Sequence, residues 1–318
     1  GSLSPVAGYL VNKRPSTATW RLTRRAVSRA GAPRSKMCHN DRGVLSALPL
    51  PLSLAVGKGE ASAGASQMQA YSKGFAKIYN TRWSGFARQV APLILDFYAA
   101  TPVGRETKTV LDLCCGTGHL AVHFLEKGYR VVGLDLSDPM LHYARENAHP
   151  YIEAGQAAFR QGEASHFTLE ERFGLVVSTY DALNHLENEQ ALRRCFQCVH
   201  AVSDGYFIFD LNTRHGLRRW NGIQVDDSDG DALLITRGIY DGQSDKAWTK
   251  ISGFLRLPDG LYERFDETTF NTVFEIEQVR GMLLDVGWKN VYFARIQDLK
   301  TPLDEPEKEG RVFIVAGK

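Results

Sequence analysis

The chain has 318 residues, of which 43% are hydrophobic, so it is long enough to bury one large core. Its formal charge is only +2, and that charge is unevenly distributed. The first 40 residues hold eight Lys and Arg and no acidic residue, which leaves a net charge of −6 on the rest of the chain. This distribution argues against a basic nucleic-acid-binding surface on the folded part.

Residues 1–66 are rich in Ser, Ala, Arg, Gly and Pro and lack periodic apolar positions, which predicts a disordered basic arm. Three origins fit this composition: a plastid or mitochondrial transit peptide, a secretory signal, or an extension absent from the mature protein. The apolar run 44–56 is too short to span a bilayer. Five cysteines, an odd count, argue against a secreted disulfide framework. We therefore expect a cytoplasmic location without a membrane anchor, with a plastid or mitochondrion as the alternative.

A folded domain is expected over residues 67–318, and it begins with an amphipathic helical stretch. Its apolar residues follow helical spacing and predict one continuous buried face: Tyr71, Phe75, Ile78, Tyr79, Trp83, Phe86, Val90 and Leu93.

A glycine turn between a strand and a helix organises the domain. The apolar run 110–113 carries a single acid, Asp112, and predicts a buried parallel strand, while residues 119–127 have helical spacing. Gly116 and Gly118 lie between them, and their lack of a side chain lets a ligand approach the main chain.

Two ligand classes fit this turn. Gly116, Gly118 and Ala121 match the dinucleotide fingerprint, so an NAD(P)-dependent oxidoreductase is one reading. However, the carboxylate of Asp112 would repel a pyrophosphate and could accept a hydrogen bond from an ammonium group. A second strand ends at Asp135, where a carboxylate could bind two ribose hydroxyls. These two acids favour S-adenosylmethionine (SAM).

The segments LDLCCGTG (111–118) and GLDLS (133–137), followed by the helix that contains Met140, closely resemble class I SAM-dependent methyltransferases. The resemblance covers roughly residues 68–318. It implies a doubly wound, mostly parallel seven-stranded α/β sheet of the Rossmann-like type, with SAM as cofactor. It also implies an N-terminal helical part that closes over the cofactor, with Tyr71, Tyr79 and Trp83 as contacts, since aromatic faces attract a sulfonium cation.

The resemblance further implies which other residues contact the cofactor. Glu163 and Ala164 resemble the acidic turn that meets the adenine amino group, although the usual acid there is Asp. The full set implied by the family motifs, beyond the three aromatic residues, is Asp112, Cys114, Gly116, Gly118, Asp135, Leu136, Met140, Glu163, Ala164 and Thr179.

The alternation of strands and helices continues after the second strand. Residues 157–160, 173–179 and 206–211 predict the third to fifth strands, and the last of these brings Asp210, Asn212 and Thr213 to the ligand-binding edge. Residues 187–202 predict a helix that contains Cys195 and Cys198. These cysteines read as residues one helical turn apart, because no second pair completes a zinc site.

An insertion over residues 214–272 interrupts this pattern. It contains three segments rich in β-branched and aromatic residues, separated by Gly-containing turns, which predict a three-stranded antiparallel sheet: 232–240, 247–257 and 261–271. A helix (275–286) and two last strands (291–297, 311–315) follow. In small-molecule methyltransferases such an insertion roofs the substrate pocket, and Trp220, Tyr262 and Arg264 are its candidate pocket residues.

The loop after the fourth strand supplies the candidate catalytic residues. Methyl transfer is an in-line displacement, so holding the acceptor in place is a large part of catalysis. His185 is the candidate base, and Tyr180 and Asn184 are candidates for orienting the acceptor. The expected acceptor is a small molecule methylated on N or O, and the oligomeric state is left open. An RNA-binding methyltransferase-fold protein that uses the basic arm is the other alternative, but nucleic acid is not favoured because no Asn-Pro-Pro-Tyr-type element follows the fourth strand.

Overall fold

The computed structural model describes residues 71–227 and 230–318. The predicted basic arm, residues 1–66, lies outside the described residues, as does the start of the domain before Tyr71. Within the described ranges, no helix is long and apolar enough to cross a membrane.

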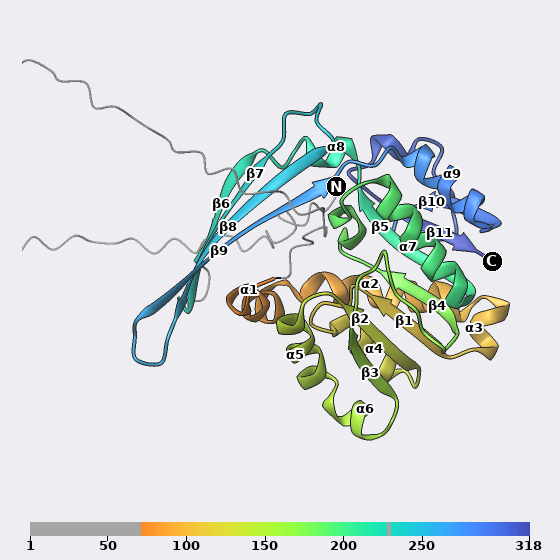
Figure 1. The fold of residues 1–318 in the computed structure, drawn as a ribbon, viewed down its shortest axis with the longest axis horizontal. Coiled ribbons are helices and arrows are strands. Elements are labelled where there is room, and N and C mark those ends of the chain that lie inside the picture. Colours follow the sequence, from red (N-terminus) through yellow and green to blue (C-terminus); the bar gives the residue numbers. More distant parts are fainter. Residues whose placement is uncertain (1–70, 228–229) are drawn as a thin grey trace, which may run out of the picture. The chain divides into compact units, whose positions relative to one another are not determined.

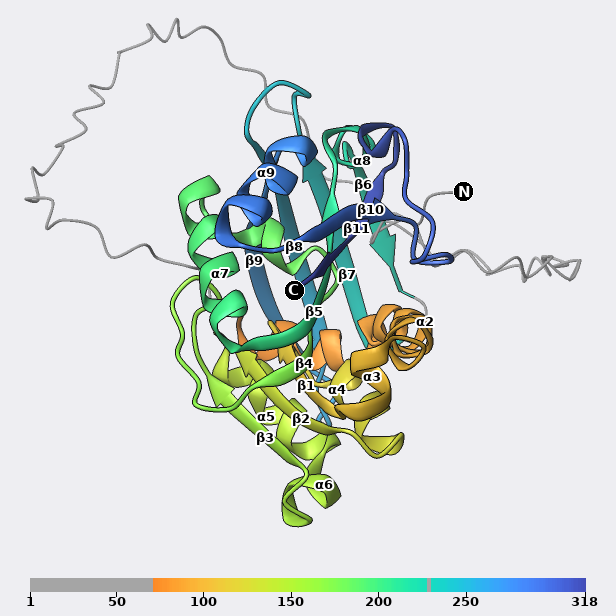
Figure 2. The ribbon, with the colours of Figure 1, turned by 90° about the vertical axis from the view of Figure 1, so that its right-hand side faces the viewer.

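A seven-stranded sheet forms the centre of the domain, with strand order β10-β11-β5-β4-β1-β2-β3 (Figure 1). The first five strands are parallel to one another, and β11 inserts antiparallel between β5 and β10 (Figure 2). Their bounds are Thr109–Leu113 (β1), Arg130–Asp135 (β2), Ala157–Gln161 (β3), Phe173–Ser178 (β4), Ser203–Asn212 (β5), Asn290–Ala294 (β10) and Arg311–Gly317 (β11). The expected seven-stranded, mostly parallel α/β sheet is confirmed.

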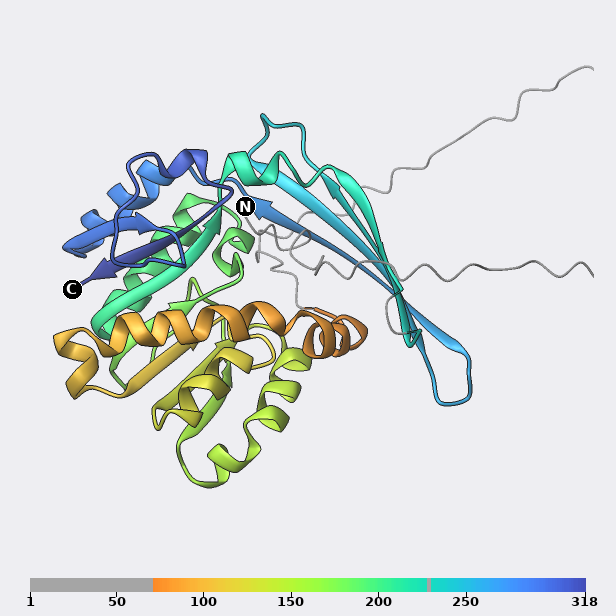
Figure 3. The same ribbon diagram turned by 180° about the vertical axis from the view of Figure 1, so that it is seen from behind.

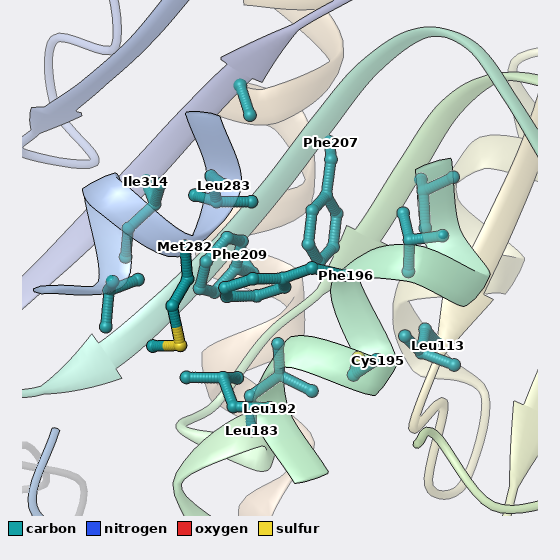
Figure 4. Close-up of a cluster of buried hydrophobic side chains, with 14 of the residues drawn as sticks. Leu113, Leu183, Leu192, Cys195, Phe196, Phe207, Phe209, Met282, Leu283 and Ile314 are labelled. Carbon is teal, nitrogen blue, oxygen red and sulfur yellow. The ribbon is translucent and has the colours of Figure 1, made fainter. Parts of the chain in front are cut away.

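Helices cover both faces of this sheet, which is why β4 is buried along its whole length. Alternate strand residues divide between two cores: Phe207 and Phe209 face one, and Ile208 faces the other. Helices α7 (Glu189–Val202) and α9 (Ile276–Val286) pack on the first face, where Figure 4 shows the core that they enclose. The second face carries α2 (Gly85–Ala99), α4 (His119–Glu126) and α5 (Asp138–Asn147). The connections contain further short helices, among them α3 (Pro102–Glu106), α6 (His149–Glu153), α8 (Arg214–Leu217) and η3 (Pro306–Lys308).

A second sheet, here called the covering sheet, follows β5 and has the strand order β6-β7-β8-β9. Its strands are Gly222–Asp226 (β6), Ala232–Ile239 (β7), Lys246–Arg256 (β8) and Tyr262–Thr272 (β9). The expectation of three antiparallel strands was therefore one strand short. The missed strand β6 has only five residues, four of them exposed, so it shows no buried alternation that a sequence could reveal.

The N-terminal helical stretch is broken, contrary to the expected continuous face. Helix α1 (Lys73–Ile78) passes into a π-helical turn, η1 (Tyr79–Trp83), before α2 begins at Gly85. A π-helical turn has more residues than an α-helical one and shifts the phase of the pattern. Within α2, Ile94 is buried where Leu93 was expected, and Leu93 is exposed.

Helix α1 packs against the covering sheet on one side and against α5 on the other (Figure 3, orange). Phe75 shares a core with Ile251 of β8 and Met140 of α5, and Ile78 packs with Leu234 of β7. Alternation along β8 buries Ile251 and exposes Trp248, so the covering sheet turns its inner face to α1. The segment from Tyr71 to Trp83, here called the lid segment, therefore begins with a helix that lies between the covering sheet and α5.

Candidate active site

The glycine turn after β1 is tied to the end of β2 by one carboxylate. Asp135 accepts the backbone N–H of Gly116 through Oδ2 and that of Ser137 through Oδ1, both at 2.8 Å. Burial raises the pKa of Asp135, and these two hydrogen bonds oppose the shift. Since each carboxylate oxygen has two acceptor sites, Asp135 keeps capacity for two further hydroxyl donors.

Asp112 is a buried acid without a full set of partners. It is 2% exposed, and its Oδ2 has no hydrogen-bond partner. Burial, with a smaller effect of the charge on Asp135, raises the pKa of Asp112 to about 8. A buried carboxylate of this kind is costly unless a cation pairs with it, so the site suits a ligand ammonium group.

The two glycines of the turn have different roles. Both have positive φ, +54° for Gly116 and +75° for Gly118. A side chain at Gly116 would meet only the ring of Tyr79, at 3.4 Å, whereas one at Gly118 would press on Ala144 of α5 at 3.0 Å. The close approach of α4 and α5 therefore also requires a glycine at position 118, while the expectation that both glycines open the main chain to a ligand stays a prediction.

Aromatic side chains of the lid segment form a continuous row above this turn. Tyr71 stacks on Phe75 at 4.4 Å between ring centroids, and Phe75 meets the edge of Trp83 at 5.4 Å. Tyr79 lies 5.9 Å from Tyr180 in the loop after β4. The structure thus brings together the three aromatic residues expected at the cofactor, and Met140 packs against the same row.

The other residues expected to contact the cofactor lie at the ends of β1 to β4, and they include Glu163 and Ala164, which are expected at the adenine amino group. The carbonyl of Leu136 accepts the side-chain amide of Gln161 at 2.9 Å, which joins the loops after β2 and β3. Glu163 accepts the hydroxyl of Ser165, and Ala164 beside it is buried. Cys114 and Thr179 are both half-buried at the ends of β1 and β4.

His185 lies where three elements meet. It belongs to the 3-10 turn η2 (Ala182–His185), its Nδ1 is 3.0 Å from Oγ1 of Thr269 on β9, and its ring meets Tyr71 edge-on at 6.4 Å. Burial lowers the pKa of His185, while the nearby carboxylate of Asp181 opposes the shift. A neutral imidazole can accept a proton, as a base must.

Asn184 has a different position from the one expected. Its side chain is fully buried, and its Nδ2 donates to the carbonyls of Asn212 and Thr272, at 3.2 and 2.9 Å. Its Oδ1 accepts the N–H of Asn212 at 2.9 Å. Both amide donors are used to join η2 to β5 and β9, so Asn184 has no donor left to orient an acceptor.

A charged cluster under Tyr180 was missed by sequence reasoning. Arg311, the first residue of β11, forms ion pairs with Asp181 at 2.7 Å and with Asp210. Asp210 in turn accepts the N–H groups of Tyr180 and Asp181. Tyr180 and Asp181 have φ values of +70° and +51°, a conformation that costs a non-glycine residue on the order of 1 kcal/mol. The positions of Tyr180 and Asp210 at the sheet edge were foreseen, but Arg311 was not, because an arginine that opens an apolar strand resembles a surface residue.

The candidate pocket residues of the insertion are corrected. Tyr262 is 54% exposed, and Arg264 is exposed and paired with Asp266. Trp220 packs in a separate small core near α8. The inner face of the covering sheet instead presents residues such as Glu267, whose carboxylate accepts the N–H of Ser72 at 2.8 Å. Strand phase decides which side chains point inward, and the alternation of residues along a curved strand does not reveal that phase.

Cys195 and Cys198 lie on α7 as free thiols, one helical turn apart, and Cys195 is buried in the core. No group of His, Cys, Asp or Glu that could hold a metal ion occurs in the part of the chain that the structure describes.

A doubly wound sheet with a glycine turn after β1, an acid at the end of β2 and a partly unpaired acid within β1 defines a nucleoside-binding enzyme of the methyltransferase type. A family model described as a methyltransferase domain matches residues 110–203. The chain is 34% identical over 190 residues to a demethylmenaquinone methyltransferase of Lactiplantibacillus plantarum, covering 58% of this chain and 72% of that protein. It is 29% identical over 221 residues to a Geobacillus protein named as a methyltransferase, covering 68% and 87%.

Solved structures share the fold at low sequence identity. An SAM-dependent methyltransferase from Clostridium acetobutylicum aligns with a TM-score of 0.63 and 21% identity, over 77% of this chain and 97% of that one. The sugar N-methyltransferase KedS8 from Streptoalloteichus aligns with a TM-score of 0.58 and 16% identity, over 82% and 99%. The chain belongs to the class I SAM-dependent methyltransferases. SAM is its cofactor, and the oxidoreductase alternative is set aside.

Proposed function

We propose that the enzyme methylates a nitrogen or oxygen atom of a small molecule, and that the residues described above bind the cofactor and the acceptor. The observation that carries this proposal is that the lid segment, packed on the covering sheet and α5, places its aromatic row above the glycine turn and so covers the ligand-binding edge. An acceptor that reaches such an enclosed edge must be small or must present a thin, exposed group.

The proposed contacts with SAM follow from the unused hydrogen-bond acceptors of two acids and from the faces of three aromatic rings. The unpaired Oδ2 of Asp112 suits the ammonium of the methionine part, and Asp135 has acceptor capacity for the ribose hydroxyls. The faces of Tyr71, Tyr79 and Trp83 suit a sulfonium cation. Bound SAM supplies an electrophilic methyl group for an in-line displacement.

The acceptor end is built around His185 and Tyr180. His185 is held by Thr269 and is neutral at physiological pH because burial lowers its pKa, so it can take the proton of a hydroxyl acceptor. An amine acceptor that binds in its neutral form does not need a base. KedS8 is named a sugar N-methyltransferase and the Lactiplantibacillus relative a demethylmenaquinone methyltransferase, so both amino sugars and quinols belong among the acceptors to test.

The test is a transfer assay with radiolabelled SAM and four acceptor classes: amino-sugar nucleotides, phenols, quinols and a mixed RNA. We expect label in one of the small-molecule classes and none in RNA. Salt-sensitive labelling of RNA, with no small molecule methylated, would overturn the proposal and favour the RNA-binding alternative.

A further inference from the structure

We propose that Arg311 is a positioning residue of the methyltransferase site, which locks the left-handed turn Tyr180–Asp181 and so fixes the ring of Tyr180 beside the lid segment. The proposal deepens the proposed function, because it assigns a role at the same end of the site to a residue on the last strand of the chain.

One carboxylate accepts hydrogen bonds from both residues of the turn Tyr180–Asp181. Asp210, on β5, accepts the N–H of Tyr180 through Oδ1 at 2.7 Å and the N–H of Asp181 through Oδ2 at 2.9 Å. Both N–H groups point to the same side because both residues adopt positive φ. The positive-φ non-glycine residues of the described chain are these two and Cys114, and all lie in the turns that follow β1 and β4. Strain of this kind is concentrated at the edge where the cofactor binds.

Arg311 makes this arrangement electrostatically possible. Asp181 and Asp210 are both buried, with side chains 7% and 0% exposed. Because the same arginine pairs with both of them, their two carboxylates are near neighbours and would repel each other without it. Arg311 pairs with both carboxylates: its Nη2 donates a hydrogen bond to Asp181 at 2.7 Å, and its Nη1 donates one to Asp210. A planar guanidinium bonds two carboxylates at once, which the single ammonium of lysine cannot do in the same geometry.

Arg311 also contacts the aromatic residues above the turn. Its guanidinium carbon lies 5.0 Å from the ring centroid of Phe86 on α2 and 5.8 Å from that of Tyr180. These two rings stack at 4.6 Å with an interplanar angle of 17°. Tyr180 in turn lies 5.9 Å from Tyr79, whose ring covers Gly116. A chain of contacts therefore runs from Arg311 through Tyr180 and Tyr79 to the glycine turn.

The test uses the full chain and S-adenosylhomocysteine, so its result does not depend on the identity of the acceptor. The variants are Arg311→Lys, Arg311→Met, and Arg311→Met combined with Asp181→Asn and Asp210→Asn, which leaves no uncompensated buried charge. Arg172→Met is the matched control, because Arg172 pairs with Asp204 across the amino ends of β4 and β5, far along the strands from the turn. Melting temperature establishes that each variant is folded.

We expect amide hydrogen exchange in residues 180–184 to accelerate about tenfold or more in the folded Arg311 variants, since loss of the lock frees the turn to open. We expect the Kd for S-adenosylhomocysteine to rise by about tenfold, the scale of a lost charge-assisted contact in a preorganised site. Arg311→Lys should show no further loss of affinity in a Tyr180→Ala background, since the effect passes through Tyr180. The control should match the parent in both measurements.

Parent-like local exchange and affinity in a folded Arg311 variant would overturn the proposal and leave Arg311 with a purely structural role. An additive loss in the Tyr180→Ala background would equally show that Arg311 does not act through Tyr180. Failure of every acceptor in the transfer assay leaves these measurements unchanged, so the two proposals fail separately.

Discussion

Asp135 joins the glycine turn to the end of β2, and its replacement tests the ribose role directly. Asp135→Ala should weaken SAM binding by about 1.5–3 kcal/mol, the scale of hydrogen bonds to a charged group. Calorimetry measures this change, with Asp138→Ala as the control because Asp138 is exposed at the start of α5. Unchanged affinity in Asp135→Ala would remove Asp135 from the cofactor site.

Replacement of Asp112 by Asn should make the ligand-free protein more stable and should weaken SAM binding. Burial raises the pKa of Asp112 from the ordinary value of 3.8 to about 8 in the folded protein, so the folded state holds the proton more tightly. Folding stability therefore falls by up to about 1.4 kcal/mol per pH unit as the pH rises from 4 to 8. Asp112→Asn does not titrate, so without ligand it should be more stable than the parent, and the gap should widen toward pH 8.

The same variant should bind SAM more weakly, because it lacks the charge that would pair with the ammonium group. Urea denaturation at pH 5 and pH 8 measures the change in folding stability, and calorimetry measures the change in affinity for SAM. A variant that binds SAM normally but unfolds more easily would make Asp112 a structural residue.

At the scale of elements, the contact between η2 and β9 determines the role of His185. His185→Gln keeps a hydrogen-bonding side chain next to Thr269 but removes the base, so with a hydroxyl acceptor the rate should fall about a hundredfold or more. Thr269→Val is the companion variant, which leaves the imidazole but frees its orientation, and it should have a smaller effect. A rate within a few fold of the parent at saturating acceptor would exclude base catalysis by His185.

The secondary-structure elements also show which features of the fold the sequence could predict. Strong local patterns, such as the buried run of β4 and the alternation in β8, predicted the central sheet and most of the insertion. The π-helical turn η1 was not foreseen, since the apolar pattern of residues 71–90 fits one continuous α-helix and carries no signal for a π turn. The site shows the same limit. The glycine turn could be predicted because it is local in sequence, whereas the ion pairs of Arg311 could not, because its partners are 101 and 130 residues away.

At the scale of the whole molecule, the boundary of the domain is a proposal that truncation can test. Residues 1–66 have too little periodic apolar sequence to offset the entropy of ordering them. A chain that begins at Met68 should therefore fold, bind SAM and melt within about a degree of the full chain. Limited proteolysis of the full chain should cut first within residues 21–34, where five arginines occur. Protection of those sites, or a large loss of stability on truncation, would place the boundary elsewhere.

The position of β11 has a consequence for synthesis of the protein. This strand contains residues 311–317 of 318, yet it lies between β5 and β10 in the sheet and supplies Arg311. Until residues 311–317 have left the ribosome, β5 therefore has an open edge, and Asp181 and Asp210 lack the arginine that pairs with both of them. A chain stalled before residue 311 should expose that edge to chaperones and fail to bind the cofactor. Competence to bind it should appear only after residues 311–317 have left the ribosome.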